Sequence, residues 1–158
     1  MILRNLNKVV LFFAMSFITI GVQAQVSVFT GDSGEKLVIQ ATPELGKDTA
    51  LIKFEGTPQS PWQNKIIKVN KTNHSSGDRY NFEYTLVLSD GNHKKEWGIL
   101  VESGTKLIKG TQARRMELYL QGSQKPVQLF HDVGLTKSSQ KIDMKADYKK
   151  KPYIPVVD

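Results

Sequence analysis

The chain has 158 residues and no cysteine, and its 22 Lys and Arg against 15 Asp and Glu give a formal net charge of +7. A chain of this length buries one hydrophobic core and not two, so we expect a single domain. The lack of cysteine excludes a disulfide-stabilised scaffold and leaves no residue for lipid attachment.

The first 24 residues have the regions of a secretory signal peptide in the expected order. Arg4 and Lys8 supply the positive start, 9–22 is apolar, and small residues precede a cleavage point before Gln25. The apolar stretch is too short for a comfortable membrane-spanning helix. We therefore expect a signal helix that is cleaved, and a mature bacterial protein that is periplasmic or secreted.

Cleavage leaves 134 residues with a formal charge of +5, because Arg4 and Lys8 are removed with the signal peptide. The segment 136–158 carries six Lys and three Asp, a net charge of +3. We interpret 136–158 as a solvated, lysine-rich tail, with weak contact to an anionic surface such as lipopolysaccharide as the alternative. Export argues against a nucleic-acid partner.

The strongest local pattern is the alternation of apolar and polar residues over Tyr80–Leu88. Alternation of this kind predicts a half-buried strand, and the Asp90-Gly91 pair that follows favours a tight hairpin turn. The return strand is predicted over His93–Glu102. We expect the core face of this hairpin to carry Phe82, Tyr84, Leu86 and Leu88 on one strand and Trp97, Ile99 and Val101 on the other.

Other short apolar runs lie between Gly, Pro, Asn and Asp residues, and none predicts a helix. They are Val26–Thr30, Lys36–Thr42, Ala50–Glu55, Lys65–Asn70, Lys106–Lys109, Arg114–Gln121 and Pro126–His131. About 8 to 9 short strands separated by turn signals are typical of an antiparallel β-sandwich or a small barrel. The sequence thus predicts an all-β domain over 25–135, with one helical turn around Ile142 and Ala146 and an edge strand at Tyr153–Val157 in the tail.

Local signatures of catalysis or metal binding do not occur in the sequence. There is no G-x-S-x-G turn, and His74, His93 and His131 lack the short spacing of zinc ligands. Asp32 and Glu35 could ligate calcium, but a Gly-rich hairpin explains them better. We therefore assign no catalytic residue, metal or cofactor. A glycan-directed hydrolase stays open, because a pair of catalytic carboxylates needs no sequence mark.

The first candidate binding loop contains Trp62, Gln63 and Asn64 in a stretch too polar for a strand. A flat aromatic ring in a proline-stiffened loop, beside amide groups, is suited to contact with a sugar or a protein. The alternative is that Trp62 folds inward and caps one end of the core, because a tryptophan buries a large apolar area.

The second candidate loop, 71–79, is polar throughout, and such loops on a rigid β scaffold often carry binding function. Its end, together with the next residue, reads Ser76-Gly77-Asp78-Arg79-Tyr80 and resembles the S-G-x-x-Y motif of bacterial periplasmic lysozyme inhibitors. The resemblance covers five residues and implies a loop that enters the lysozyme cleft, with Ser76 and Tyr80 as the inserting groups. Tyr80 also begins the alternating strand, so a core position is its alternative.

These features favour an exported, non-enzymatic binding module that recognises a protein or an envelope polymer. Its most concrete form is an inhibitor or immunity-type protein against a wall-degrading enzyme. The first alternative is a domain that binds envelope glycan or lipopolysaccharide through Trp62 and the lysine-rich tail. The second alternative is the glycan-directed hydrolase.

Overall fold

The computed structural model describes residues 25–57, 61–76, 79–89 and 92–154, with the backbone alone for 73–76 and 79–82. The expected signal peptide, 1–24, lies outside the described residues. Eight strands follow one another along the chain. They are β1 (Val26–Thr30), β2 (Lys36–Ala41), β3 (Thr49–Glu55), β4 (Ile66–Ser76), β5 (Arg79–Ser89), β6 (Lys94–Ile108), β7 (Thr111–Leu120) and β8 (Val127–His131).

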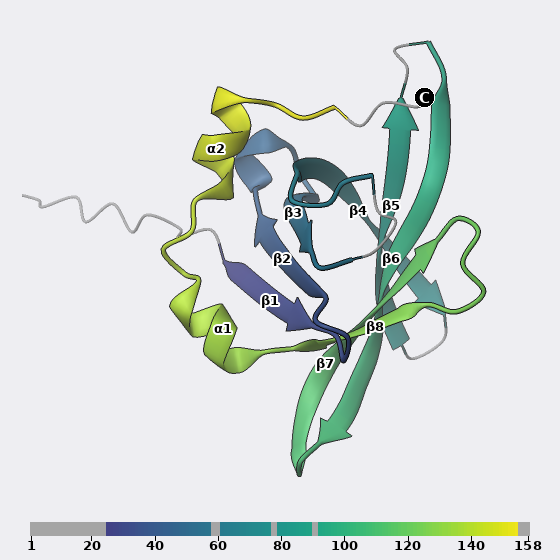
Figure 1. The fold of residues 1–158 in the computed structure, drawn as a ribbon, viewed down its shortest axis with the longest axis vertical. Coiled ribbons are helices and arrows are strands. Elements are labelled where there is room, and N and C mark those ends of the chain that lie inside the picture. The colour runs from purple at the N-terminus through teal and green to yellow at the C-terminus, as the bar shows by residue number, and fades with distance from the viewer. Residues whose placement is uncertain (1–24, 58–60, 77–78, 90–91, 155–158) are drawn as a thin grey trace, which may run out of the picture.

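The strands form one closed antiparallel barrel in which each strand pairs with its neighbours in the sequence and β8 pairs with β1 (Figure 1). The all-β prediction is confirmed, and of the two architectures left open the chain forms the barrel. The run Lys106–Lys109, predicted as a separate strand, is the last three residues of β6 and the first residue of the turn that follows. Strand β6 continues past a bulge at Gly104, whose φ of 92° suits glycine, and so eight strands replace about nine.

The barrel interior is packed with side chains from all eight strands. Its core includes Phe29, Leu37, Ile52, Ile67, Tyr84, Leu100, Met116 and Leu129. On β5, Tyr84, Leu86 and Leu88 are buried as predicted, while the side chain of Phe82 lies outside the described part. Each fully buried aliphatic or aromatic side chain contributes about 1.5–3 kcal/mol to folding, so this filling is the main source of stability.

The predicted core face of β6 is partly wrong, because a bulge changes which side of the strand faces inward. Leu86 pairs with Gly98 but Val87 pairs with Glu96, which leaves Trp97 as the extra residue. Trp97 packs against the core, and from Gly98 to Glu102 the even-numbered residues face inward. Leu100 is therefore in the core, whereas Ile99 and Val101 are half-buried on the outer wall. Alternation in the sequence does not reveal an inserted residue.

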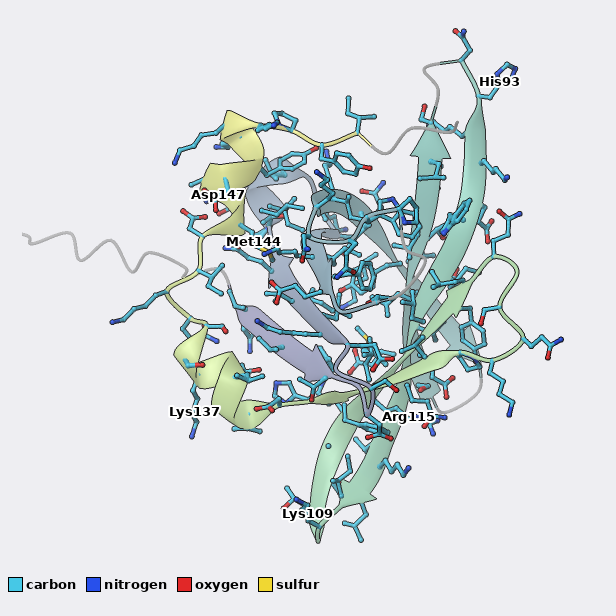
Figure 2. All side chains as sticks on the ribbon, in the orientation of Figure 1. His93, Lys109, Arg115, Lys137, Met144 and Asp147 are labelled. Carbon is cyan, nitrogen blue, oxygen red and sulfur yellow. The ribbon has the colours of Figure 1, made fainter. Side chains whose placement is uncertain are left out.

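The segment after the barrel is more ordered than a solvated tail. It forms two short helices, α1 (Val133–Ser138) and α2 (Met144–Lys150), each with an aspartate that caps its first turn. Met144 of α2 is 1% exposed and packs with Val28 and Val38, and Figure 2 shows its side chain between α2 and the strands while Lys137 points away. The predicted single helical turn is thus an underestimate, because the sequence does not show the outer face of β1–β3 that the helices cover.

A short 3-10 helix, Pro43–Leu45, connects β2 to β3. The predicted edge strand at Tyr153–Val157 is not a strand over Tyr153 and Ile154, and the rest of it lies outside the described residues. Within the ranges that the structure describes, no helix is both long enough and apolar enough to span a membrane.

Candidate functional site at one mouth of the barrel

The two predicted binding loops lie at opposite ends of the barrel. In an up-and-down barrel the β2–β3, β4–β5 and β6–β7 connections share one end, which we call the hairpin mouth, and the β3–β4 loop lies at the other. Strand β4, of 11 residues, joins the loop that contains Trp62 to the Ser76–Tyr80 hairpin. At a rise of about 3.3 Å per residue, β4 separates them by roughly 30 Å. One compact partner site does not combine them.

Trp62 fills the end of the barrel away from the hairpin mouth. The indole is 0% exposed, with its ring centroid 6.4 Å from that of Phe54 and 6.3 Å from that of Trp97 in an edge-on arrangement. The hydroxyl of Tyr153 donates to the carbonyl of Pro61 at 3.2 Å and so ties the C-terminal segment over this loop. The structure therefore corresponds to the alternative in which Trp62 caps the core.

Gln63 and Asn64 hold the same loop in shape. The Gln63 side-chain oxygen accepts from the Thr57 backbone amide at 3.1 Å, and the Asn64 backbone amide donates to the Phe54 carbonyl at 2.8 Å. Asn64 is exposed and has a φ of 59°, a left-handed conformation that asparagine tolerates better than most residues. The side-chain amides of Gln63 and Asn64 therefore do not surround an exposed aromatic face, because the ring of Trp62 is buried.

The Ser76–Tyr80 segment forms the tip of the β4–β5 hairpin. Ser75 pairs with Tyr80 and Ser76 pairs with Arg79, so the backbone places these four residues beside the turn at the hairpin mouth. Gly77 lies outside the described residues, as do the side chains of Ser76 and Tyr80. The position at the end of a hairpin suits the predicted contact role, which stays a prediction.

The hairpin mouth leads to a cavity that sequence analysis did not identify. The cavity has a volume of about 150 Å³, and its polar lining includes Lys71, Glu102 and Arg114 with Tyr84 beside them. Arg114 Nε donates to Glu102 Oε1 at 2.6 Å and Arg114 Nη2 donates to Oε2 at 3.1 Å, a two-point ion pair. The Glu102 side chain is 16% exposed and the Arg114 side chain 45%, so the guanidinium reaches the mouth.

Burial and the ion pair set the protonation of this cluster. Burial raises the pKa of Tyr84 to about 12, with a smaller contribution from the Glu102 charge, so Tyr84 is a neutral phenol at pH 7. The hydrogen bond to Glu102 raises the pKa of Arg114, and burial lowers the pKa of Lys71. The Tyr84 hydroxyl and the cations Lys71 and Arg114 are hydrogen-bond donors that can bind a carboxylate or an amide oxygen. None of the three is a nucleophile in the protonated form.

The β6–β7 hairpin carries a concentration of positive charge past this mouth. The stretch 103–116 contains four Lys and Arg and no Asp or Glu, and Figure 1 shows the hairpin extending beyond the rest of the barrel. Leu107 is 67% exposed near its tip, and Lys109 at the turn points into solvent in Figure 2. Arg114 and Arg115 pair with Glu102 and Glu117 at the base of the hairpin, so the cations nearer its tip are Lys106 and Lys109.

Two contacts at the base of the hairpin fix its direction. Arg115 Nε donates to Ser103 Oγ at 2.8 Å and Arg115 Nη2 to the Ser103 carbonyl at 3.2 Å. Lys106 Nζ lies 5.1 Å from the centre of the Phe130 ring, a cation–π distance. The hairpin is therefore held to the barrel by side chains on its outer face, while Leu107 and Arg114 share the face toward the mouth.

His131 has a structural position at the edge of the mouth. Its Nε2 lies 3.0 Å from Thr136 Oγ1, and its ring centroid lies 5.4 Å from that of Phe29. Thr136 Oγ1 also accepts from the Val28 amide at 2.9 Å, so this contact fastens α1 to β1 beside the two-residue ladder that closes the barrel. In the described ranges no three His, Cys, Asp or Glu side chains are grouped as metal ligands would be.

No family model, curated protein or solved structure matches this chain. The five-residue resemblance to the lysozyme inhibitors therefore rests on its own residues and on their place at a hairpin tip.

Proposed function

We propose that this protein is an exported, non-enzymatic binding module that recognises a partner protein at the hairpin mouth. The observation that carries the proposal is the cationic β6–β7 hairpin, which extends past a polar mouth and presents Leu107 and Arg114 on the face toward it. An exposed apolar side chain beside an arginine at a concave surface is the usual equipment of a protein contact.

The charge of the hairpin indicates the chemistry of the partner. Lys106 and Lys109, which are exposed near the hairpin tip, attract an acidic surface at long range, and Glu102 holds the guanidinium of Arg114 rigidly at the centre. The neighbouring β4–β5 tip, with Ser76 and Arg79, faces the same end. The most concrete form of this binding module is an inhibitor or immunity-type protein whose hairpins cover the cleft of a wall-degrading enzyme that has an acidic rim.

The glycan or lipopolysaccharide alternative loses one of the two features on which it depended, because the Trp62 ring is inside the core. In the tail, Lys145 pairs with Glu44 at 2.8 Å, while Lys137, Lys141, Lys149, Lys150 and Lys151 are exposed. For the hydrolase alternative, the one carboxylate in the mouth cavity, among the residues described as lining it, is Glu102, whose two oxygens accept from Arg114. We therefore favour the protein-binding function.

Inhibition of purified muramidases, followed as the clearing of a peptidoglycan suspension, tests this proposal. The mature chain 25–158 should inhibit at least one muramidase with an acidic cleft at near-stoichiometric concentration. Lys109→Glu should weaken inhibition about tenfold or more, because it reverses a charge at the hairpin tip. Lys137→Glu, the same change on exposed α1, is the matched control and should have little effect. Absence of inhibition across the panel, or equal effects of the two variants, would contradict the proposal.

A further inference from the structure

The cavity at the hairpin mouth has a polar rim above an apolar floor. Lys71 and Tyr84 are paired across β4 and β5, so these two lining residues lie at the same height in the barrel. On β7, Met116 lies farther into the barrel than Arg114, and both Met116 and Phe29 are buried beneath the cavity. A polar group that enters from the mouth therefore meets the cations before it reaches the apolar side chains.

The described lining of the cavity carries more positive than negative charge. It contains the cations Lys71 and Arg114 and one carboxylate, Glu102, so its formal charge is two minus one, or +1. Glu102 is already engaged, because its two oxygens accept from Arg114 at 2.6 and 3.1 Å. The charge of Asp48 also acts on Lys71, but Asp48 is exposed and solvent screens it. The lining thus complements a ligand with one negative charge.

Hydrogen-bond donors converge on the cavity from three strands. A guanidinium has five N–H groups, and the contacts of Arg114 with Glu102 engage two of them. Arg114 Cζ also lies 5.5 Å from the centre of the Phe29 ring, a cation–π distance. The ammonium of Lys71 and the hydroxyl of Tyr84 add donors from β4 and β5. Because Arg114 is held between a carboxylate and a ring, it loses little freedom when it binds a ligand.

The size of the cavity suits a carboxylate on a short stem. Its volume is about 150 Å³, and a water molecule takes up about 30 Å³ in the liquid. The cavity therefore has room for roughly five non-hydrogen atoms, which is the size of a carboxylate with one or two methylene groups. An apolar floor lowers the local dielectric constant and so strengthens the ion pairs above it. A phosphate dianion would bring a second negative charge, for which the described lining holds no further cation.

We propose that this cavity is a binding pocket for one carboxylate group, and that an Asp or Glu side chain of the partner protein supplies it. Lys71, Tyr84 and Arg114 donate to the carboxylate, and Glu102 positions the guanidinium. The assignment to a partner rests on the proposed function, in which an acidic surface is drawn to the hairpin mouth. A free short-chain carboxylic acid has the same chemistry, so the experiment separates the two sources.

Titration of the chain 25–158 with sodium acetate, followed by nuclear magnetic resonance, tests the pocket without a partner. Acetate should shift the Arg114 Nε–H resonance until it saturates, and sodium chloride at the same ionic strength should not. Lys71→Gln should raise the dissociation constant about tenfold, because it removes a charged donor. Lys109→Gln, which removes the same charge at the exposed hairpin tip, is the matched control and should leave the constant unchanged.

Tyr84→Phe provides a second variant that keeps the buried ring and removes only the hydroxyl. It should raise the dissociation constant about threefold, because one neutral hydrogen bond is lost. Unchanged amide resonances in β1 and β2 establish that each variant is folded. A resonance that does not shift with acetate, or equal effects of Lys71→Gln and Lys109→Gln, overturns the pocket.

Competition identifies the source of the carboxylate. Acetate at about ten times its dissociation constant should weaken inhibition of a sensitive muramidase about tenfold relative to sodium chloride, because it occupies the place of the partner's side chain. Inhibition that bound acetate leaves unchanged would overturn the assignment to a partner and make a free carboxylic acid the ligand. A chain that binds acetate but inhibits no muramidase would contradict the proposed function, and with it the partner assignment, while the pocket stands.

Discussion

Replacing Trp62 by alanine separates a structural tryptophan from a binding one. Its side chain is 0% exposed and lies against the rings of Phe54 and Trp97. Removing a buried tryptophan costs about 3–5 kcal/mol, because the transfer free energy is lost and a cavity remains. That loss is a large fraction of the roughly 5–15 kcal/mol that stabilises a typical domain. It corresponds to a fall in melting temperature on the order of 10–20 °C.

The assay is urea unfolding of the chain 25–158 followed by far-ultraviolet circular dichroism, with partner capture measured below the transition. Leu107→Ala is the matched control, because Leu107 is 67% exposed and its removal should change the free energy of unfolding by less than about 0.5 kcal/mol. If Trp62→Ala loses less than about 0.5 kcal/mol, the packing argument for this end of the barrel is refuted.

Three further changes test the core, the barrel closure and the mouth. Leu86→Ala should cost about 2–5 kcal/mol in urea unfolding, since Leu86 is 0% exposed, and a loss near zero would mean that β5 is in the wrong register. Burial, then the Arg114 charge, lowers the pKa of His131, so the unfolded chain binds that proton more readily. The free energy of unfolding should therefore fall as the pH drops below about 6.5, and an unchanged slope in His131→Gln would contradict this. Glu102→Gln should lower the pKa of Tyr84 from about 12, as measured by phenolate absorbance, because Glu102 contributes to raising it; no change would refute that coupling.

The strands could be predicted from the sequence because their pattern is local. Val26–Thr30 is predicted with the bounds that the structure has, and the β5–β6 hairpin follows from alternation and its Asp-Gly turn. The bulge at Trp97 could not be predicted, because one inserted residue leaves the composition of β6 unchanged while it moves Leu100 inward and Ile99 outward. Closure into a barrel is likewise a long-range property, which depends on the two pairs between β1 and β8.

The mouth was not predictable for a related reason. Glu102 and Arg114 are 12 residues apart and sit in strands that alternation alone marks as amphipathic, so nothing local indicates that both side chains face inward. The helices of the tail had a readable signal in Asp132 and Asp143, which cap them, but the surface that they cover exists only after β1–β3 have folded. Local turn and cap chemistry is thus visible in the sequence, whereas inward-facing polar groups are not.

The distribution of charge after folding explains why the hairpin mouth, and not the tail, is the surface to test first. The tail has the larger number of lysines, yet α2 packs on the barrel through Met144, and Lys145 is paired with Glu44. The β6–β7 hairpin has fewer cations, and Arg114 and Arg115 pair with Glu102 and Glu117 at its base, but Lys109 is exposed at the tip that extends past the barrel. Because exposed charges act over about 10 Å at 0.1 M salt, a partner would meet the hairpin before it met the wall. The order of contact, and with it the salt dependence of association, therefore follows from how the cations are displayed and not from how many each segment contains.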